Sequence, residues 1–292
     1  MKTHLTAERT KATQVVVPFT GEGAYHGSTK PRRASAPAST DPGPPAAAPP
    51  AEMQATTLGE YAERGVDTIE SFDAVFPNRF ETVSTLGVPT QQEVRDDGVT
   101  FCWCPLDEAL PLAGPLTRRV LLEMQEHLAG GKRYVYVDAK IQYFEPGDVP
   151  VDSQHWHVDG SITARGAQVQ RLGHGLLHDM RARLLGSATP PQYLAYQSSE
   201  HCATMLAAEP VSVRLPDLIP NFDELDAKVR ARKPRSASQP AGAIVRFDGL
   251  SLHRAVAASA AGWRLWVRAV ETDRKVQLTR SIIECYGTVF RT

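Results

Sequence analysis

One short stretch of the sequence, QHWHVDG at 154–160, contains two side chains that could bind the same metal ion. In an extended chain successive side chains alternate between two faces, so His157 and Asp159 point one way and Val158 points the other. An imidazole and a carboxylate would then reach one ion together. The chain contains nine histidines, and a single His-x-Asp often arises by accident in such a chain, so the pair alone does not establish a site.

A third ligand is available in His253, which follows a predicted strand and a polar turn in the stretch GAIVRFDGLSLH at 242–253. Two histidines and one carboxylate leave other positions of the ion open, and non-haem Fe(II) enzymes use this arrangement to bind a cosubstrate and O₂. A structural zinc site would instead be closed by four protein ligands. On its own, His253 would be interpreted as an ordinary core or turn histidine.

An arginine follows the third histidine by eleven residues, in the alternating stretch GWRLWVR at 262–268. A strand here places Arg264, Trp266 and Arg268 on one face. A guanidinium buried in a β core needs an anionic partner, and its fork geometry suits a carboxylate. The pattern favours the carboxylate of a bound ligand over a protein carboxylate such as Glu271 or Asp248.

These residues resemble the signature of the Fe(II)- and 2-oxoglutarate-dependent dioxygenases, which is His-x-Asp, a distant His, and an Arg or Lys about ten residues later. By that resemblance His157, Asp159 and His253 are the iron ligands and catalytic centre, and Arg264 binds the distal carboxylate of 2-oxoglutarate, with Arg268 as the other candidate. The implied cofactors are Fe(II), 2-oxoglutarate as cosubstrate, and O₂. The implied reaction is hydroxylation of a small substrate.

The stretch FEPG at 144–147 is similar to the Tyr-x-Pro-Gly turn of the prolyl-hydroxylase-like branch of this family. Phe144 stands where that branch has tyrosine, so the tyrosine hydroxyl is either missing or supplied by Tyr143. The gap from Gly147 to the first histidine is also longer. The resemblance covers residues 134–270 and implies a double-stranded β-helix, the jelly-roll core of cupin-like proteins.

Two other functions remain open at this point. His155 and His157 could form the His-x-His of a cupin-type metalloprotein that does not use 2-oxoglutarate, since both side chains share a face in an extended chain. The chain could also be a non-catalytic β-barrel binding module whose histidines are incidental.

Alternating hydrophobic residues predict the strands that position these side chains, at 134–144, 193–197, 211–215, 243–247 and 263–270. Helical spacing predicts helices at 58–80, 115–129 and 221–233, the last opened by a capping Asn221. Helices precede strands without regular βαβ alternation. The expected fold is therefore mainly β with flanking helices (α+β), around an antiparallel core.

The N-terminal part has a different composition. Residues 31–50 contain seven prolines and six alanines, so little there could be buried. We expect a disordered tail and linker at 1–56, with at most one edge strand at 15–19, and an oxygenase domain with a helical N-terminal part at 57–292.

Composition excludes several classes of protein. The 32 basic and 33 acidic residues give a net charge of −1, which argues against general polyanion binding, and 42% hydrophobic residues exclude a fully disordered chain. No apolar run reaches the length of a membrane span or forms a secretory signal, so we expect a cytoplasmic protein without a membrane partner. The four cysteines are expected to be free thiols.

Basic residues suggest the kind of substrate. The segment at 164–186, between the second and third predicted ligands, contains Arg165, Arg171, Arg181 and Arg183 and would form an electropositive wall. This favours an anionic small molecule. A second basic cluster at 228–235 could contact nucleic acid, but basic residues at the end of a helix are also what the helix dipole favours, and we prefer that interpretation.

Overall fold

The structure is a computed structural model that describes residues 71–98, 100–150, 154–159, 180, 183–186, 188–216 and 222–275. The expected tail and linker at 1–56, the strand at 15–19, most of the helix at 58–80, most of the basic wall at 164–186, and the capping Asn221 lie outside these residues. The assignment of 57–292 to one oxygenase domain stays a prediction.

An antiparallel sheet of six strands forms the centre of the fold, in the order β2-β9-β5-β11-β4-β3. Its longest pair is β4 (Tyr134–Phe144) with β11 (Gly262–Thr272), which stay in register over their full lengths. The other strands are β2 (Glu81–Thr85), β3 (Phe101–Pro105), β5 (Gln192–Gln197) and β9 (Ala243–Asp248). The predicted strands at 134–144, 193–197, 243–247 and 263–270 are confirmed.

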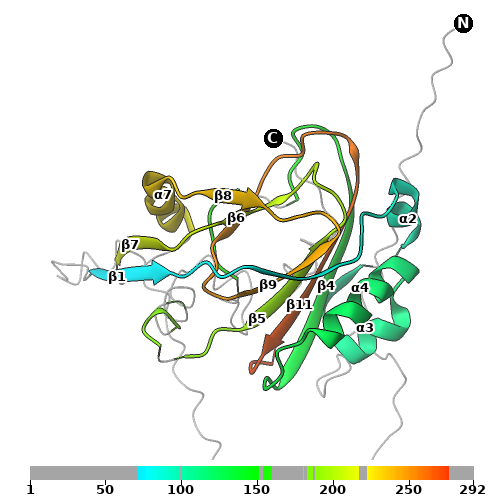
Figure 1. Cartoon of the computed structure of the whole chain (residues 1–292), viewed down its shortest axis with the longest axis horizontal. Helices are drawn as coiled ribbons and strands as arrows, with labels where there is room; N and C mark the ends of the chain where they lie inside the picture. Colours follow the sequence, from blue (N-terminus) through cyan, green and yellow to red (C-terminus); the bar gives the residue numbers. More distant parts are fainter. Residues whose placement is uncertain are drawn as a thin grey trace, which may run out of the picture.

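Two smaller antiparallel sheets accompany the large one in the described part of the chain (Figure 1). Three strands pair in the order β10-β6-β8, namely β10 (His253–Ala255), β6 (Thr204–Ala207) and β8 (Ser236–Ser238). A ribbon pairs β1 (Ser71–Phe76) with β7 (Val211–Pro216), which confirms the strand predicted at 211–215. Sequence analysis did not predict β6, β8 or β10, because strands of three or four residues are too short to show alternation.

Helices cover one side of the large sheet. The helices α2 (Gln91–Asp96), α3 (Leu106–Leu112) and α4 (Pro115–Glu126) lie beside β4 and β11, whereas α7 (Phe222–Arg232) lies against β7 at the other end of the molecule (Figure 1). The helices predicted at 115–129 and 221–233 are thus confirmed as α4 and α7, each slightly shorter than expected.

The core lies between α4 and the sheet. Leu121 and Met124 of α4 are fully buried in a cluster that includes Ile141 of β4 and Leu265 of β11. Burying each such side chain contributes about 2 kcal/mol. The start of α4 is fixed by Asp97, whose carboxylate accepts hydrogen bonds from the first N–H groups of the helix.

The helix predicted over 58–80 is wrong over its described part, where Ser71–Phe76 is strand β1. Phe72, Ala74 and Phe76 form its inward face, and Asp73 and Val75 point outward. Aromatic residues four positions apart fit one face of a helix and one face of a strand equally well. Pairing with β7 decides between them here.

The polar face of β4 is buried rather than solvated. Asp138 is 0% exposed and Gln142 is 2% exposed, so the strand is covered on both faces and is not the half-buried strand that alternation predicts. Tyr143, expected on the apolar face, is 43% exposed. The polar face of β4 is the one that faces the candidate site.

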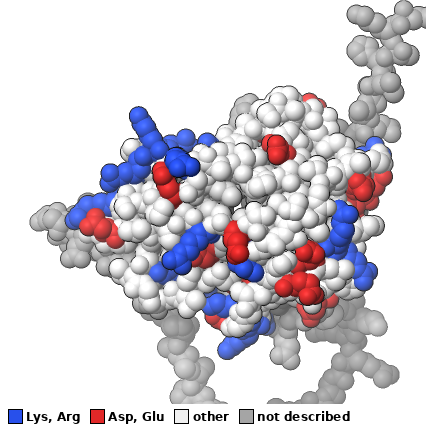
Figure 2. All heavy atoms as spheres, viewed as in Figure 1, with Lys and Arg blue, Asp and Glu red and all other residues white. Residues whose placement is uncertain are grey.

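The described chain is therefore mainly β, with antiparallel sheets and a few helices. This agrees with the expected class, a mainly β protein with flanking helices. Among the described helices, none combines the length and the hydropathy needed to cross a membrane. Acidic and basic side chains are both scattered over the face shown in Figure 2, among many uncharged residues.

Candidate metal centre

His157 and His253 are brought together by their own backbones. An isolated antiparallel bridge joins the two residues, with two N–H to carbonyl hydrogen bonds of 3.0 Å each. The bridge sets the imidazoles side by side, with ring centroids 4.5 Å apart. Phe222 packs 5.6 Å from the His157 ring and Phe247 packs 5.4 Å from the His253 ring. Both imidazoles are thus held by backbone pairing and by aromatic contacts.

Hydrogen bonds fix the same tautomer in both rings. Nδ1 of His157 lies 2.8 Å from the carbonyl oxygen of His155, and Nδ1 of His253 lies 3.0 Å from the carbonyl oxygen of Ser251. A carbonyl oxygen only accepts, so each Nδ1 carries the proton and each Nε2 presents its lone pair. Histidines that bind metals are commonly oriented in this way.

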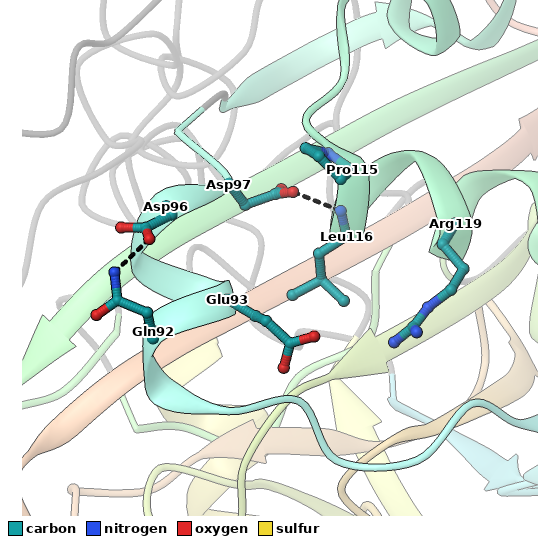
Figure 3. Close-up of a pocket in the computed structure, with 7 residues that line it drawn as sticks. All are labelled: Gln92, Glu93, Asp96, Asp97, Pro115, Leu116 and Arg119. Atoms are coloured by element: carbon teal, nitrogen blue, oxygen red, sulfur yellow. Dashed lines mark hydrogen bonds between the residues drawn. The ribbon is translucent and has the colours of Figure 1, made fainter.

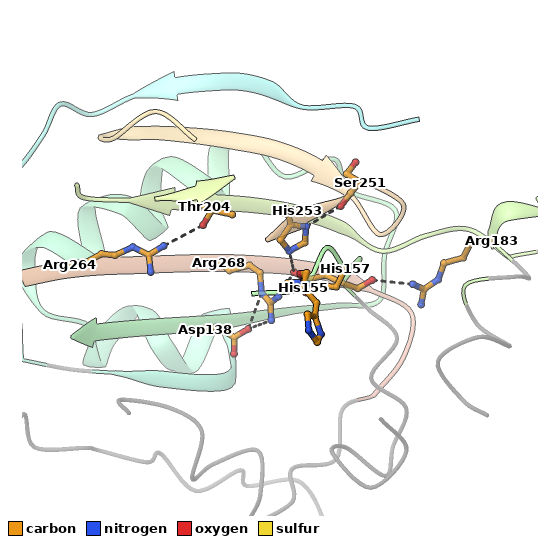
Figure 4. Close-up of polar contacts among 10 residues, drawn as sticks. Asp138, His155, His157, Arg183, Thr204, Ser251, His253, Arg264 and Arg268 are labelled. Carbon is orange, nitrogen blue, oxygen red and sulfur yellow. Dashed lines mark hydrogen bonds and ion pairs between the residues drawn. The ribbon is translucent and has the colours of Figure 1, made fainter. Parts of the chain in front are cut away.

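Asp159 completes the group. Its Oδ2 lies 3.5 Å from Nε2 of His253, and one ligand atom from each of His157, Asp159 and His253 lies within 4.8 Å of the other two. Figure 4 shows the two histidines converging beside β11. The structure thus brings together the three residues that the sequence predicts as ligands, in an arrangement that could hold a metal ion.

Arg268 holds the carboxylate of Asp159. Its Nη1 donates to Oδ2 of Asp159, and its Nη2 and Nε lie 2.6 and 3.1 Å from Oδ2 of Asp138. Burial by itself would raise the pKa of Asp159, but the Arg268 guanidinium lowers that pKa well below its ordinary value. Asp159 is therefore ionised, as a metal ligand must be.

Desolvation also sets the charge of His157. Burial, together with the neighbouring His253, lowers the pKa of His157 to about 4. The ring is therefore neutral near pH 7, and a neutral imidazole is the form that binds a metal ion.

A cavity of about 160 Å³ opens beside the three residues. The large sheet contributes Lys140, Trp266 and Arg264 to its wall, and β6 contributes Thr204 and Leu206. The cavity therefore lies between the two larger sheets. It is large enough for a small organic acid.

Arg264 is the unusual residue of this cavity. It is 3% exposed, its Nη2 makes long hydrogen bonds of 3.4 and 3.3 Å to Gln197 and Thr204, and its Nε has no hydrogen-bond partner among the described residues. Burial lowers the pKa of Arg264 from its ordinary value. No carboxylate of the described chain lies within ion-pair distance of this guanidinium.

The protein carboxylates that could have paired with Arg264 are used elsewhere. Glu271 accepts from the backbone N–H groups of Ala129 and Gly130 at 2.7 and 2.8 Å. Asp248 accepts from the N–H of Leu250 at 2.9 Å and from the Ser251 hydroxyl at 3.1 Å. The interpretation of Arg264 as half of an internal ion pair with either residue is therefore wrong.

His155 points away from the group. Its Nδ1 lies 3.0 Å from Oδ1 of Asp223 on α7, and only its carbonyl oxygen faces the site, through the bond to His157. The histidine pair of the cupin-type alternative is thus not assembled in this structure. The contact of His155 with the group is the hydrogen bond that its carbonyl oxygen accepts from Nδ1 of His157.

The turn after β4 does not supply a hydroxyl to the cavity. Phe144 is fully buried against Cys202 and Ala258, and Tyr143 packs edge-on against Trp263, 5.4 Å between centroids, with its side chain partly exposed. The tyrosine hydroxyl of the prolyl-hydroxylase-like turn is therefore missing at this position, and Tyr143 does not replace it.

Of the four arginines expected in an electropositive wall, only Arg183 is described. It is 7% exposed, and its Nη1 donates to the backbone carbonyl of Asp159 at 3.2 Å. Arg183 therefore supports a ligand of the candidate centre rather than lining an open surface. Arg165, Arg171 and Arg181 lie outside the described residues.

Sequence reasoning missed Asp138 as part of the site. Its register partner across β4 and β11 is Arg268, so pairing the two predicted strands in this register would have revealed a buried acid opposite a buried base. Alternation alone places Asp138 on a polar face and does not distinguish solvent from a binding site.

A second hollow, of about 310 Å³, lies between α2 and α4 (Figure 3). It is lined by acidic residues together with Arg119, and its buried carboxylate, Asp97, is bound to the first turn of α4. Glu93 and Asp97 cap helices and Asp96 accepts a hydrogen bond from Gln92, so its geometry gives no reason to assign it a ligand.

Comparisons with known proteins add little to this geometry. No family model matches the sequence. No curated protein matches it. A solved structure described as "Non-heme monooxygenase, ThoJ-Ni complex" is 10% identical with a TM-score of 0.29, and the match covers 68% of this chain and 77% of that one. A similarity this low carries no argument about fold or activity.

Proposed function

We propose that this protein is a non-haem Fe(II)- and 2-oxoglutarate-dependent dioxygenase that hydroxylates a small anionic substrate. The observation that carries the proposal is that Arg264, a buried guanidinium with no carboxylate partner in the described chain, lines the same cavity as His157, Asp159 and His253. A metal centre and an unneutralised cation in one cavity suit a ligand that has a chelating end and a distal carboxylate.

The donor set fits a divalent iron ion. Two imidazole nitrogens and one carboxylate oxygen are the ligands that non-haem Fe(II) enzymes use, and the fixed Nδ1–H tautomers direct both Nε2 lone pairs into the cavity. Thiolates, which would favour zinc or an iron–sulfur cluster, are absent from the converging group.

Arg264 fits the distal carboxylate of 2-oxoglutarate. Its weak contacts to Gln197 and Thr204 leave the guanidinium able to form short, charge-assisted hydrogen bonds with a bound carboxylate. Arg268 is not available for this role, because its guanidinium already donates to the carboxylates of Asp138 and Asp159. Of the two arginines that the sequence offers, Arg264 is therefore the proposed anchor.

When bound, iron and 2-oxoglutarate supply the oxidising chemistry, in which 2-oxoglutarate and O₂ become succinate and CO₂ as the substrate gains a hydroxyl group. The chain's own residues bind and orient these groups. Leu206 and Phe247 line the cavity with apolar surface and limit access of water, and Arg264 fixes the far end of the cosubstrate. No side chain is required as a general base.

We also propose that the two larger sheets form a double-stranded β-helix. All the strand pairings of the described chain are antiparallel, and the cavity is lined by β11 on one side and by β6 and β10 on the other. A ligand site between two facing antiparallel sheets is the arrangement of a jelly-roll core.

An anionic small molecule remains the proposed substrate. Lys140 lines the cavity with its Nζ 5.7 Å from the centroid of Trp266, so a cation and an aromatic ring lie together on one wall. Nucleic acid is less favoured, because the helix α7 pairs two of its basic residues internally, Lys228 with Glu224 at 3.6 Å and Arg230 with Asp226 at 2.6 Å.

The proposal is tested by anaerobic equilibrium dialysis with Fe(II) and labelled 2-oxoglutarate, followed by a screen of anionic small molecules for succinate release in O₂. We expect one iron per chain, loss of iron in His157→Ala and His253→Ala, and unchanged iron with roughly 100-fold weaker 2-oxoglutarate binding in Arg264→Ala. Arg214→Ala, which removes an exposed arginine that pairs with Asp73 at 3.7 Å, is the matched control.

Other outcomes would select other functions. Absence of iron binding in the wild type would favour the non-catalytic binding module. Loss of iron in His155→Ala, with no requirement for 2-oxoglutarate, would favour the cupin-type alternative. If Arg268→Ala weakened 2-oxoglutarate more than Arg264→Ala did, the anchor assignment would be wrong and the class of enzyme would stand.

A further inference from the structure

Arg268 lies in an aromatic enclosure next to the candidate metal centre. Its guanidinium carbon is 5.4 Å from the ring centroid of Trp103, 5.5 Å from that of Tyr193 and 5.3 Å from that of Trp266. Aromatic faces stabilise a cation and at the same time restrict its movement. Arg268 is 7% exposed, so the enclosure also separates it from solvent.

Asp138 fixes the inner edge of that guanidinium. Oδ2 of Asp138 accepts from both Nη2 and Nε of Arg268, at 2.6 and 3.1 Å, and Nη1 is left to donate to Asp159. Oδ1 of Asp138 accepts a hydrogen bond of 2.8 Å from the backbone N–H of Trp103. Both oxygens of a fully buried carboxylate are therefore used to orient one arginine.

The backbone of β3 is distorted where it meets Asp138. Phe101 pairs with Ala139 and Cys104 pairs with Val137, so β3 contains one residue more than β4 over this interval. Within the bulge Trp103 has a φ of +48°, in the left-handed region that a bulky residue rarely adopts. Such a conformation is strained, and bulges commonly redirect groups next to active sites.

The bulge has a specific effect here. It turns the N–H of Trp103 toward the side chain of Asp138 and places the indole ring over Arg268. One strained residue thus supports both the carboxylate and the cation. The contacts form a continuous chain from the Trp103 backbone through Asp138 and Arg268 to Asp159.

We propose that Arg268 is a positioning residue for the metal centre, held by Asp138 and by the bulge at Trp103, and that its function is to hold the carboxylate of Asp159 toward His157 and His253. This inference rests on the proposed metal site and adds to it. In this inference Arg268 binds a carboxylate of the protein, whereas Arg264 binds the carboxylate of 2-oxoglutarate.

Co(II) tests this inference, because its affinity can be measured by calorimetry and its visible absorption reports the ligand geometry. We expect Asp138→Asn, which keeps the shape of the buried side chain, to weaken Co(II) binding about 10-fold, and Arg268→Gln to weaken it by about 10- to 100-fold. Both variants should change the visible spectrum. Arg214→Ala, which removes an exposed arginine outside the cavity that pairs with Asp73 at 3.7 Å, should change neither quantity.

A double variant separates positioning from a general loss of structure. If Asp138 acts through Arg268, then adding Asp138→Asn to Arg268→Gln causes no further loss of Co(II) affinity. Arg268→Lys should recover part of the unfolding temperature that Arg268→Gln loses but not the wild-type spectrum, since a single ammonium group restores the charge but cannot bridge both carboxylates.

Two results would contradict different parts of this inference. If the wild-type protein fails to bind Co(II), the metal site itself is wrong, and this inference fails with it. If the wild type binds Co(II) and Asp138→Asn matches it in affinity and spectrum, the metal site stands and the positioning role of Arg268 is wrong. The isosteric Asp138→Asn keeps the test decisive even if Arg268→Gln does not fold.

Discussion

The backbone of His157 is hydrogen-bonded to the backbone of His253 in both directions, with both distances at 3.0 Å. This bridge places two imidazoles from distant parts of the chain side by side before any ion is bound. It also links the loop that follows β4 to the start of β10. The candidate centre is thus built on backbone hydrogen bonds, with side-chain contacts as the second constraint.

Asn78 is expected to support this bridge from outside the cavity. Its Oδ1 accepts from the N–H of Leu252 at 2.8 Å, its Nδ2 donates to the carbonyl of Glu209 at 2.6 Å, and its φ is +50°. Asn78→Ala should lower the free energy of unfolding by about 2 kcal/mol, because the buried N–H of Leu252 and the partly buried carbonyl of Glu209 lose their partner. Urea unfolding measures this change.

A matched control for that variant is Arg214→Ala, whose side chain is exposed and makes only a 3.7 Å ion pair with Asp73. A change within about 0.5 kcal/mol is expected there. If Asn78→Ala is no less stable than Arg214→Ala, the contribution assigned to Asn78 is wrong.

The metal-free protein is expected to lose stability in acid because of His157. The pKa of His157 is lowered to about 4 in the folded chain, against an ordinary value near 6.5. Between these pH values the unfolded chain binds a proton that the folded chain does not. The contribution of His157 to the free energy of unfolding is therefore fully present above pH 6.5 and is lost as the pH drops toward 4. The full loss, once the folded chain also binds the proton, is about 3 kcal/mol.

Urea unfolding at pH 7, 5.5 and 4.5 in the presence of a chelator checks this dependence. The variant His157→Asn, which cannot titrate, should show a flatter profile over the same range. If both proteins lose equal stability, other groups are responsible for the acid sensitivity.

The candidate ligands could be predicted from sequence because their chemistry is local. His157 and Asp159 share a face by strand geometry, and Arg264 lies on a strand whose alternation is plain in the sequence. The convergence of His253 on this pair depends on a bridge between distant segments. Nothing in local spacing encodes that pairing, so His253 could be nominated only by its place after a predicted strand and turn, and by the resemblance to a family.

Two other features could not be predicted because the same pattern allows two structures. Phe72 and Phe76 fit a helix or a strand, and only the pairing of β1 with β7 excludes the helix. Asp138 fits a solvated face or a buried site, and only the neighbouring Arg268 shows which is present. In both cases the deciding contact is made by a residue far away in the sequence.

Metal binding is expected to stabilise the folded chain. An ion that binds His157, Asp159 and His253 only when they are assembled should raise the free energy of unfolding by about 2.7 kcal/mol at 100 times its dissociation constant. Thermal unfolding with Mn(II), before and after addition of a chelator, measures this shift. His253→Ala should unfold at one temperature whether the metal is present or not, whereas His155→Ala should keep the shift.

Arg264 and Arg268 are expected to affect stability in opposite directions. Arg264 has no carboxylate partner among the described residues, so Arg264→Met removes a buried cation and should leave the metal-free protein as stable as before or more stable. Arg268→Met leaves Asp138 and Asp159 buried without their cation, and should cost about 3–5 kcal/mol. Urea unfolding of the two variants makes the comparison directly. A stabilised Arg264→Met that no longer binds 2-oxoglutarate would mean that this cation is kept for a ligand, whereas a loss of stability equal to that of Arg268→Met would show that it serves the fold.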